Sequence, residues 1–487
     1  MLRSLQKIFL ALAAAGAVST TSAFSLMGPP TPWQTPDIGY MDPGGLALDD
    51  VGGVMNLFEA YRWDIKVIIY GFDPSFINYF GTRGVDEVNK AVAILNNLPP
   101  MSKTSRNLTE YPLDTRRVNY QAQSLSLIDL KSTALSALLS QVGLTSPERY
   151  VACLRSRVVV AGVTTNYTVL RRNFDPVTLL PTAYVNGQLY TYEIDEFPIL
   201  GGGGGSGFVD AAEIPTDPAH AFNSVVSGVN AFIARSAVNG PVVFNNLNPG
   251  VFYTGLTRDD VGGLRFLYTK NRWATETLMN DVVLGQPSGG WAPAGSGNAG
   301  GAPVGAGLRP GIDKIYFKLM KNANGFGPFL AFTNSWNDTV IVTTNGATQK
   351  TNQRLAQPMV LPHIVFVAGD LGLTAEGTPL AFGQSDSSSW QDNAQLQGVQ
   401  VGGPIWYGPG NIQVPPSSGA QQNGIGIFFS NIGYWNANSY PPTTVNEENA
   451  VIGWRWASFD GSTNAPYIYP NGGDVLQMQQ QLTGGGN

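Results

Sequence analysis

The stretch FYTGLTRDDVGGLRFLY, residues 252–268, predicts a capped helix near the middle of the chain. Thr257 stands where an N-cap side chain accepts from first-turn amides, and Asp260, three residues later, completes a capping box. Gly262 and Gly263 each cost about 1 kcal/mol in helix propensity. We therefore expect another segment of backbone to pack closely against this helix.

Two patterns carry a resemblance to a known family. LTRDDVGGLRFLY, residues 256–268, resembles the closing helix of the matrixins, which are zinc proteases of the metzincin class. RWDIKVIIYGFD, residues 62–73, followed by a helix expected from Val85, is similar to the first strand and first helix of the same domains. The resemblance implies a matrixin-like α+β domain over residues 63–284. Both ends of this region also resemble uncharacterised exported bacterial proteins.

The zinc-binding motif of that class is missing where we expect it. Metzincins hold zinc with His-Glu-x-x-His-x-x-Gly-x-x-His, and the glutamate serves as general base. The chain has two histidines, His220 and His363. With His220 as first ligand, Ala221 takes the base position, and Ser224 and Asn230 take the other ligand positions. We therefore predict no catalytic residue, no metal ligand and no cofactor.

Residues 1–23 have the order of a secretory signal peptide. Basic Arg3 and Lys7 precede the short apolar run IFLALAAAGAV, and small residues lead to Ala23, after which we expect cleavage. Residues 24–62 begin rich in Pro and Gly and are expected to be extended. The sequence predicts a secreted, cell-surface or periplasmic protein without a transmembrane anchor.

Composition narrows the possible partners. Charged residues make up 13% of the chain and its net charge is −6, without a basic stripe. This pattern argues against nucleic acid as a partner, and a weakly charged surface tolerates close self-association. Cys153 is the only cysteine, so no disulfide can form within the chain, and we expect its side chain to be buried.

Local signals predict further elements in the first domain. Asp129 and Gly143 bracket a helix as N-cap and C-terminal glycine. Asn186 and Gly187 form the turn of a hairpin. Residues 217–238 have a helical composition, although Gly228 weakens that prediction.

The last part of the chain has a different pattern. Residues 285–307 are rich in Gly, Pro and Ala and predict a linker, and residues 308–487 predict an all-β, sandwich-like domain. Four tryptophans form a candidate aromatic binding surface that could stack on sugars or on a neighbouring subunit: Trp406, Trp435, Trp454 and Trp456. Packing in the core of the domain is the alternative for these side chains.

These observations favour an exported, non-catalytic structural or binding protein of the cell envelope or extracellular matrix, on a degenerate metalloprotease-like scaffold. Self-association or a surface polysaccharide would be its partner. Two alternatives stay open: an extracellular hydrolase with an atypical site, and a carbohydrate-binding surface protein.

Overall fold

The computed structural model describes part of the chain. The described residues are 22–28, 56–148, 150–160, 164–197, 208–217, 224–228, 231–236, 240–245, 249–279, 281–285, 303–344, 346–368, 390–392, 410–412, 425–430, 433–436, 455–470 and 472.

A five-stranded sheet lies at the centre of the fold, in the order β18-β3-β21-β24-β25. Its strands are β3 (Val67–Phe72), β18 (Tyr316–Leu319), β21 (Ile364–Ala368), β24 (Ile425–Ser430) and β25 (Gly433–Asn436). The first four strands in this sheet are parallel, and β25 is an antiparallel edge strand. All five residues of β21 are buried, as expected for a parallel strand covered on both faces.

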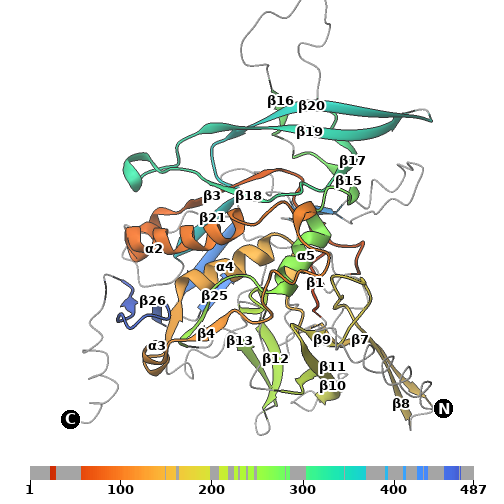
Figure 1. The fold of residues 1–487 in the computed structure, drawn as a ribbon, viewed down its shortest axis with the longest axis vertical. Helices are drawn as coiled ribbons and strands as arrows, with labels where there is room; N and C mark the ends of the chain where they lie inside the picture. The colour runs from red at the N-terminus through yellow and green to blue at the C-terminus, as the bar shows by residue number, and fades with distance from the viewer. Residues whose placement is uncertain are drawn as a thin grey trace, which may run out of the picture.

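Three helices pack beside this sheet (Figure 1). They are α2 (Pro74–Asn96), α4 (Leu130–Gln141) and α5 (Arg258–Tyr268). Asp73 caps α2 through a bond from the amide of Ser75, so this helix begins well before the predicted start at Val85. A non-helical Gly81, with φ of 63°, kinks it. α2 contacts the sheet and α4, and the buried face of α4 continues the core.

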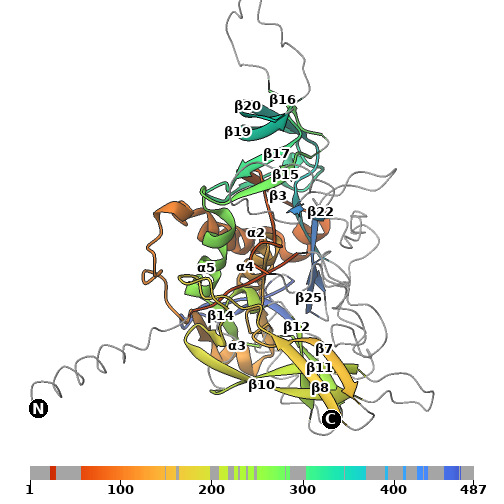
Figure 2. The same cartoon turned by 90° about the vertical axis from the view of Figure 1, so that its right-hand side faces the viewer.

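A second sheet has the order β15-β17-β19-β20-β16. Its strands are β15 (Trp273–Thr277), β16 (Val283–Leu284), β17 (Ala306–Pro310), β19 (Phe332–Thr344) and β20 (Ala347–Met359). The last two form a long hairpin, and the sequence between them, residues 345–346, is Asn-Gly, a dipeptide favoured in tight hairpin turns. Figures 1 and 2 show this hairpin on one side of the helices, and the antiparallel pair of β10 (Gln188–Phe197) and β11 (Phe208–Pro215) on the other.

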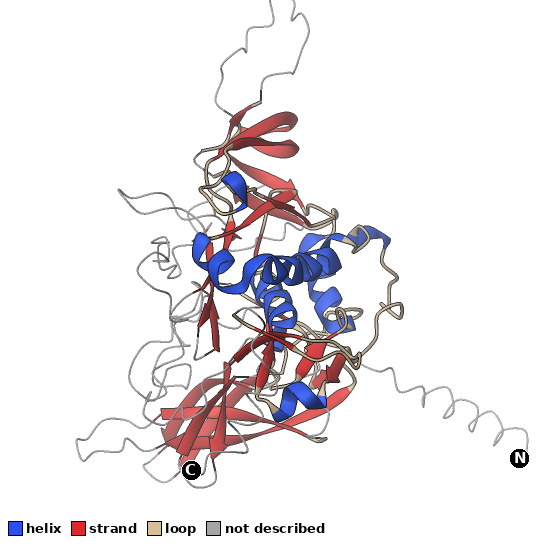
Figure 3. Ribbon diagram, turned by 90° about the vertical axis from the view of Figure 1, so that its left-hand side faces the viewer, coloured by secondary structure: helices blue, strands red, loops and turns tan. Residues whose placement is uncertain are grey.

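Shorter elements complete the described fold, and Figure 3 separates the helices from the strands. The strands are β1 (Ser25–Leu26), β2 (Tyr61–Arg62), β4 (Arg116–Val118), β5 (Leu127–Asp129), β6 (Leu144–Thr145), β7 (Cys153–Val160), β8 (Thr164–Leu170), β9 (Tyr184–Val185), β10 (Gln188–Phe197), β11 (Phe208–Pro215), β12 (Ala231–Ser236), β13 (Gly240–Asn245), β14 (Val251–Tyr253), β22 (Trp390–Asp392), β23 (Gly410–Ile412), β26 (Arg455–Ser458) and β27 (Tyr467–Ile468). The short helices are η3 (Met101–Lys103), α3 (Tyr120–Ser124), η5 (Val226–Gly228) and η6 (Ala323–Gly325).

The strand pairing does not follow the predicted division into domains 63–284 and 308–487. β3 lies between β18 and β21, and β5 pairs with β26, so strands from both segments share sheets. The mixed α/β content agrees with the α+β expectation. The described strands of the second segment do not form a separate β-sandwich. The Gly-rich composition of residues 285–307 predicts a connection, but it carries no information about which strands pair across it.

The local predictions fare better, with one exception. Thr257 and Asp260 form the predicted capping box of α5, and Asp129 caps α4. Asn186 and Gly187 have positive φ values between β9 and β10, as a tight hairpin turn requires. The predicted helix over 217–238 is wrong in its described part, because η5 is followed there by β12, which pairs with β13.

Candidate functional site

Helix α4 and the turn after it offer a second register for the metzincin motif, in which Gly143 is the one residue that keeps its type. Ser136, Ala137, Ser140, Gly143 and Ser146 stand in the order Ser-Ala-x-x-Ser-x-x-Gly-x-x-Ser. This is the spacing of His-Glu-x-x-His-x-x-Gly-x-x-His, with serine at each ligand position and alanine at the base position. The alignment on His220 is therefore not the only one. Helix α4 precedes α5 in the chain, which is the order that the resemblance requires.

The first and third of these serines converge on one short segment, residues 224–228, which contains η5. Ser136 Oγ donates to the carbonyl oxygen of Val226 at 3.0 Å. Ser146 Oγ lies 3.0 Å from Ser227 Oγ. All of these side chains are buried, so the 224–228 segment closes the space in front of the two serines.

The second serine and the glycine have different roles in the structure. Ser140 is buried, and within the described residues its Oγ has no hydrogen-bond partner. Gly143 has φ of 97°, and a Cβ on it would lie 2.4 Å from the carbonyl oxygen of Tyr61. Only glycine fits there, so the chain can turn sharply between the second and third serine positions.

Two carboxyl groups, on Asp260 and Glu148, also bond the 224–228 segment. Asp260 on α5 accepts from the amides of Val225 and Val226, at 3.2 and 3.0 Å. Glu148 accepts from the amide of Ser224 at 3.1 Å and from the hydroxyl of Ser227. Burial raises the pKa of both carboxyl groups above the ordinary range. The segment is therefore bonded to both α4 and α5.

This arrangement does not suit a catalytic zinc ion. Neutral serine hydroxyls are not the nitrogen, thiolate or carboxylate ligands that zinc takes in proteins. Ala137 offers no carboxylate to activate a water molecule. In the residues that the structure describes, no group of three or more His, Cys, Asp or Glu side chains is placed to hold a metal ion.

The histidine that the structure describes cannot activate these serines. His363 is buried, its Nδ1 accepts from the amide of Ile69 at 2.9 Å, and its Nε2 lies 3.0 Å from Gln357 Oε1. Burial lowers the pKa of His363 to about 3. It is therefore a neutral structural residue near pH 7. His220, Ala221 and Asn230 lie outside the described residues, and Ser224 precedes η5.

The candidate aromatic surface needs a correction at one residue. Trp456 is fully buried, and its ring contacts Phe80 and Phe429 at centroid distances of 6.4 and 5.1 Å. It belongs to the core, so it does not present an exposed stacking face. Trp435 lies on β25, and Trp406 and Trp454 lie outside the described residues.

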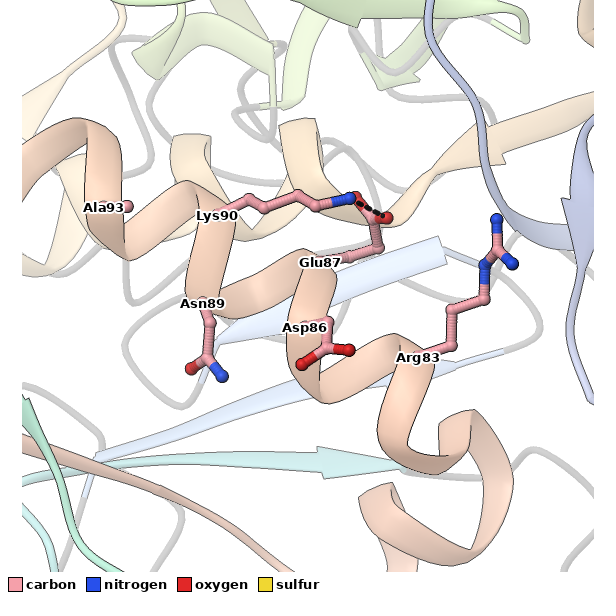
Figure 4. Close-up of a pocket in the computed structure, with 6 residues that line it drawn as sticks. All are labelled: Arg83, Asp86, Glu87, Asn89, Lys90 and Ala93. Carbon is pink, nitrogen blue, oxygen red and sulfur yellow. Dashed lines mark hydrogen bonds and ion pairs between the residues drawn. The ribbon is translucent and has the colours of Figure 1, made fainter. Parts of the chain in front are cut away.

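A second polar feature is a pocket along the outer face of α2 (Figure 4). Its lining in the described part of the chain is Arg83, Asp86, Glu87, Asn89, Lys90 and Ala93. Lys90 reaches back to Glu87, with Nζ 2.7 Å from Oε1, while Asp86 and Asn89 point to the other side of the helix. These groups could hydrogen-bond a polar ligand, but they do not combine a nucleophile with a base.

Comparison with protein-family models, with curated proteins and with solved structures found no match to this chain. In the described part of the chain, no helix combines the length and apolar character needed to cross a membrane.

The serine constellation was within reach of the sequence. Ser136, Ser140 and Ser146 repeat a small polar residue around Gly143, the one position that keeps the motif residue type. The alignment on His220 depends on histidine as the ligand type instead. The sequence gives no sign of the 224–228 segment that covers the serines, because that contact joins residues far apart in the chain.

Proposed function

We propose that this protein is an exported, non-catalytic structural or binding protein of the cell envelope or extracellular matrix, on a matrixin-like scaffold. The observation that carries the proposal is the serine constellation of α4, buried under the 224–228 segment. In this register Ser136 bonds the carbonyl oxygen of Val226 and Ser146 bonds the side chains of Glu148 and Ser227, so both hydroxyls have partners within the fold.

The scaffold proposal draws support from four elements, β3, α2, α4 and α5, in their order along the chain. β3 and α2 stand where the resemblance puts the first strand and first helix, and α5 stands where it puts the closing helix. α4, with the motif spacing, lies between α2 and α5. One departure is that β18, β21 and β24 follow α5 in the chain yet complete the central sheet.

Export is proposed from the basic, apolar and small-residue order of residues 1–23. The low charge of the chain supports a role in which copies lie close together. Self-association is therefore the partner we favour. The polysaccharide alternative now depends on Trp406, Trp435 and Trp454, since Trp456 is buried. Retention on polysaccharide that is lost in Trp454→Ala would favour it.

The direct test is the zinc content of the purified exported protein after equilibration with zinc, with a protease assay on the same sample. We expect no stoichiometric zinc and no cleavage. One zinc per chain, with cleavage that a chelator stops, would overturn the proposal and revive the hydrolase alternative.

A variant tests the scaffold itself. Ser136→His, Ser140→His and Ser146→His together restore the ligand types at the three motif positions. If these positions descend from a zinc site, the folded triple variant should bind zinc, and a control with Ser132→His in place of Ser146→His should bind it more weakly. Far-ultraviolet circular dichroism checks the folding of both. A folded triple variant without zinc affinity would count against the matrixin-like scaffold.

A further inference from the structure

We propose that the outer edge of β20 pairs with the same edge of a second copy of this chain, antiparallel and centred on Gln349. The proposal rests on the self-association included in the proposed function, and it names the surface. The β19–β20 hairpin lies at one end of the described structure, away from the β10–β11 hairpin (Figures 1 and 2).

The register of the hairpin shows which backbone groups face outward. Residues of an antiparallel strand direct their N–H and C=O groups alternately to the two neighbouring strands. The carbonyl oxygen of Arg354 accepts from the amide of Gly285, on the side of β16 and away from β19. By alternation, Thr348, Lys350 and Asn352 also direct their backbone groups away from β19.

Those outward groups face no other strand in the described residues. β16 pairs with β20 only at Leu355 and Ala356, and it is the last strand on that side of the sheet. Thr348, Lys350 and Asn352 are exposed. A row of unpaired N–H and C=O groups at a sheet edge is a ready template for another strand.

Two limits define how long a partner strand can be. On one side, Gly285 already occupies the edge at Arg354. On the other, Gly346 has φ of 79°, which is incompatible with continuing an extended strand through the turn. The open edge therefore runs from Ala347 to Gln353, and any second strand must fit within it.

Charge and space then select the register of a two-fold pair. Centring the pair on Lys350 would set the two Lys350 side chains directly opposite each other, and like charges opposed across strands are destabilising. Centring it on Thr351 would push the partner strand into Gly285. Centring it on Gln349 places Thr348 of each copy opposite Lys350 of the other, and Ala347 opposite Thr351. This register avoids both the directly opposed Lys350 pair and the overlap with Gly285.

The occupant is a second copy because the edge is complementary to itself in this register. Thr348 and Lys350 exchange backbone hydrogen bonds with their counterparts, and the two Gln349 carboxamides meet on the axis, where each can donate and accept. Lys350 and Arg354 are the charges on the exposed face of this strand, and neither lies directly opposite a like charge, while the two Lys350 residues are diagonal neighbours. An isologous contact of this kind closes a dimer.

Disulfide trapping tests the geometry. Under mild oxidation, Gln349→Cys should form a covalent dimer, because residues paired across a two-fold axis bring their Cβ atoms within reach of a disulfide. Asn352→Cys, on the same strand and also exposed, should remain monomeric, since its counterpart lies several residues away. The wild-type chain is the background control, because Cys153 is fully buried.

A proline variant tests the backbone bonds. Lys350→Pro removes an outward N–H that the hairpin itself does not use, whereas Lys350→Ala keeps it. With Gln349→Cys in both, trapping should fall at least about tenfold in the proline variant and persist in the alanine variant.

Equal trapping of Gln349→Cys and Asn352→Cys, or no effect of proline, overturns the β20 edge. If light scattering still shows large particles, assembly stands and this surface is wrong. A strict monomer at every concentration would instead contradict the assembly role itself.

Discussion

The backbone N–H of Ala23 donates a 2.6 Å hydrogen bond to Oδ1 of Asp259, the first acidic residue of helix α5. Both residues are buried, and the other oxygen of this carboxyl accepts from the amide of Asn186 at 2.7 Å. Burial raises the pKa of Asp259 well above its ordinary value, and the nearby Asp260 and Glu148 raise it further. Residue 23, which sequence analysis places at the end of a cleaved leader, is therefore part of the core.

The position of cleavage should decide the stability of the mature chain. A cut after Ala23 removes the N–H that donates to Asp259. A cut after Ser22 keeps Ala23 and turns this N–H group into an N-terminal ammonium group beside Asp259. The side chain of Ser22 contributes no hydrogen bond that would be lost, because its buried Oγ has no partner in the described residues. We expect a chain that begins at Ala23 to exceed one that begins at Phe24 by about 1.5–3 kcal/mol in unfolding free energy. Chemical denaturation of the two chains measures this difference.

An acetylated Ala23 chain is the matched control, because it keeps the N–H donor but loses the positive charge. Its stability should fall between the other two. Equal stability of all three chains would show that the Ala23–Asp259 contact contributes nothing.

A buried cluster of charges beside β15 predicts a pH dependence. Arg62 Nε lies 2.6 Å from Glu276 Oε1, and Arg309 Nε lies 3.2 Å from Asp338 Oδ1. The charges of both ion pairs act on Asp64. Burial, and then the charge of Glu276, raises the pKa of Asp64 to about 8. The folded protein thus keeps a proton on Asp64 that the unfolded chain releases near pH 4.

The sign of this effect follows from proton uptake on folding. The stability that the protonated Asp64 contributes is complete below about pH 4 and is lost as the pH rises towards about 8. Asp64→Asn cannot ionise, so its stability should fall less over this range than that of the wild type. Thermal unfolding midpoints of both proteins from pH 5 to 9 check this, and parallel curves would contradict it.

We expect His363 not to titrate between pH 8 and 4.5. Its lowered pKa, about 3, arises from burial, so the ring should stay neutral while an exposed histidine titrates near 6.5. The chain has two histidines, so nuclear magnetic resonance can follow both from pH 8 to 4.5. One imidazole signal should stay unchanged, and Gln357→Ala should identify it through the loss of the Nε2 contact. A midpoint near 6.5 for that signal would refute the buried, neutral assignment.

The cap of α5 should matter more than an ordinary N-cap. Thr257 Oγ1 contacts Asp260 at 2.6 Å and accepts from Asn186 Nδ2 at 3.2 Å. Thr257→Ala should therefore lower the unfolding free energy by about 2 kcal/mol, the upper end for caps. Thr463→Ala, at an exposed position in the bend after β26, is the control and should change it by less than about 0.5 kcal/mol. Similar losses in both variants would remove the special role of this cap.

The elements that the sequence predicts correctly depend on neighbours within a few positions. The capping box of Thr257 and Asp260, the N-cap at Asp129 and the turn at Asn186 all depend on bonds between nearby residues. Alternation of Trp454 and Trp456 predicts a shared strand face, but not whether that face is covered. The ring of Phe429, which covers Trp456, comes from another strand.

Longer-range pairing accounts for the misses. The Ala, Phe, Ile and Arg residues of 231–236 are compatible with either a helix or a strand. Their strand conformation depends on the pairing of β12 with β13. The candidate site has the same dependence. Ser136 and Ser146 are visible in the sequence, but their burial follows from the 224–228 segment, which α5 holds through Asp260.

The position of β3 between β18 and β21 constrains the order in which the protein can fold. Val67 finds its parallel partner at Tyr316, and Tyr70 finds its own at Ile364. A chain that emerges from its N-terminus must therefore hold an apolar strand unpaired until most of its length has appeared. Such non-local topology makes folding slow and leaves the nascent chain dependent on protection from aggregation. If the chain is exported unfolded, as we propose, the same delay would keep it competent for transport until its last strands arrive.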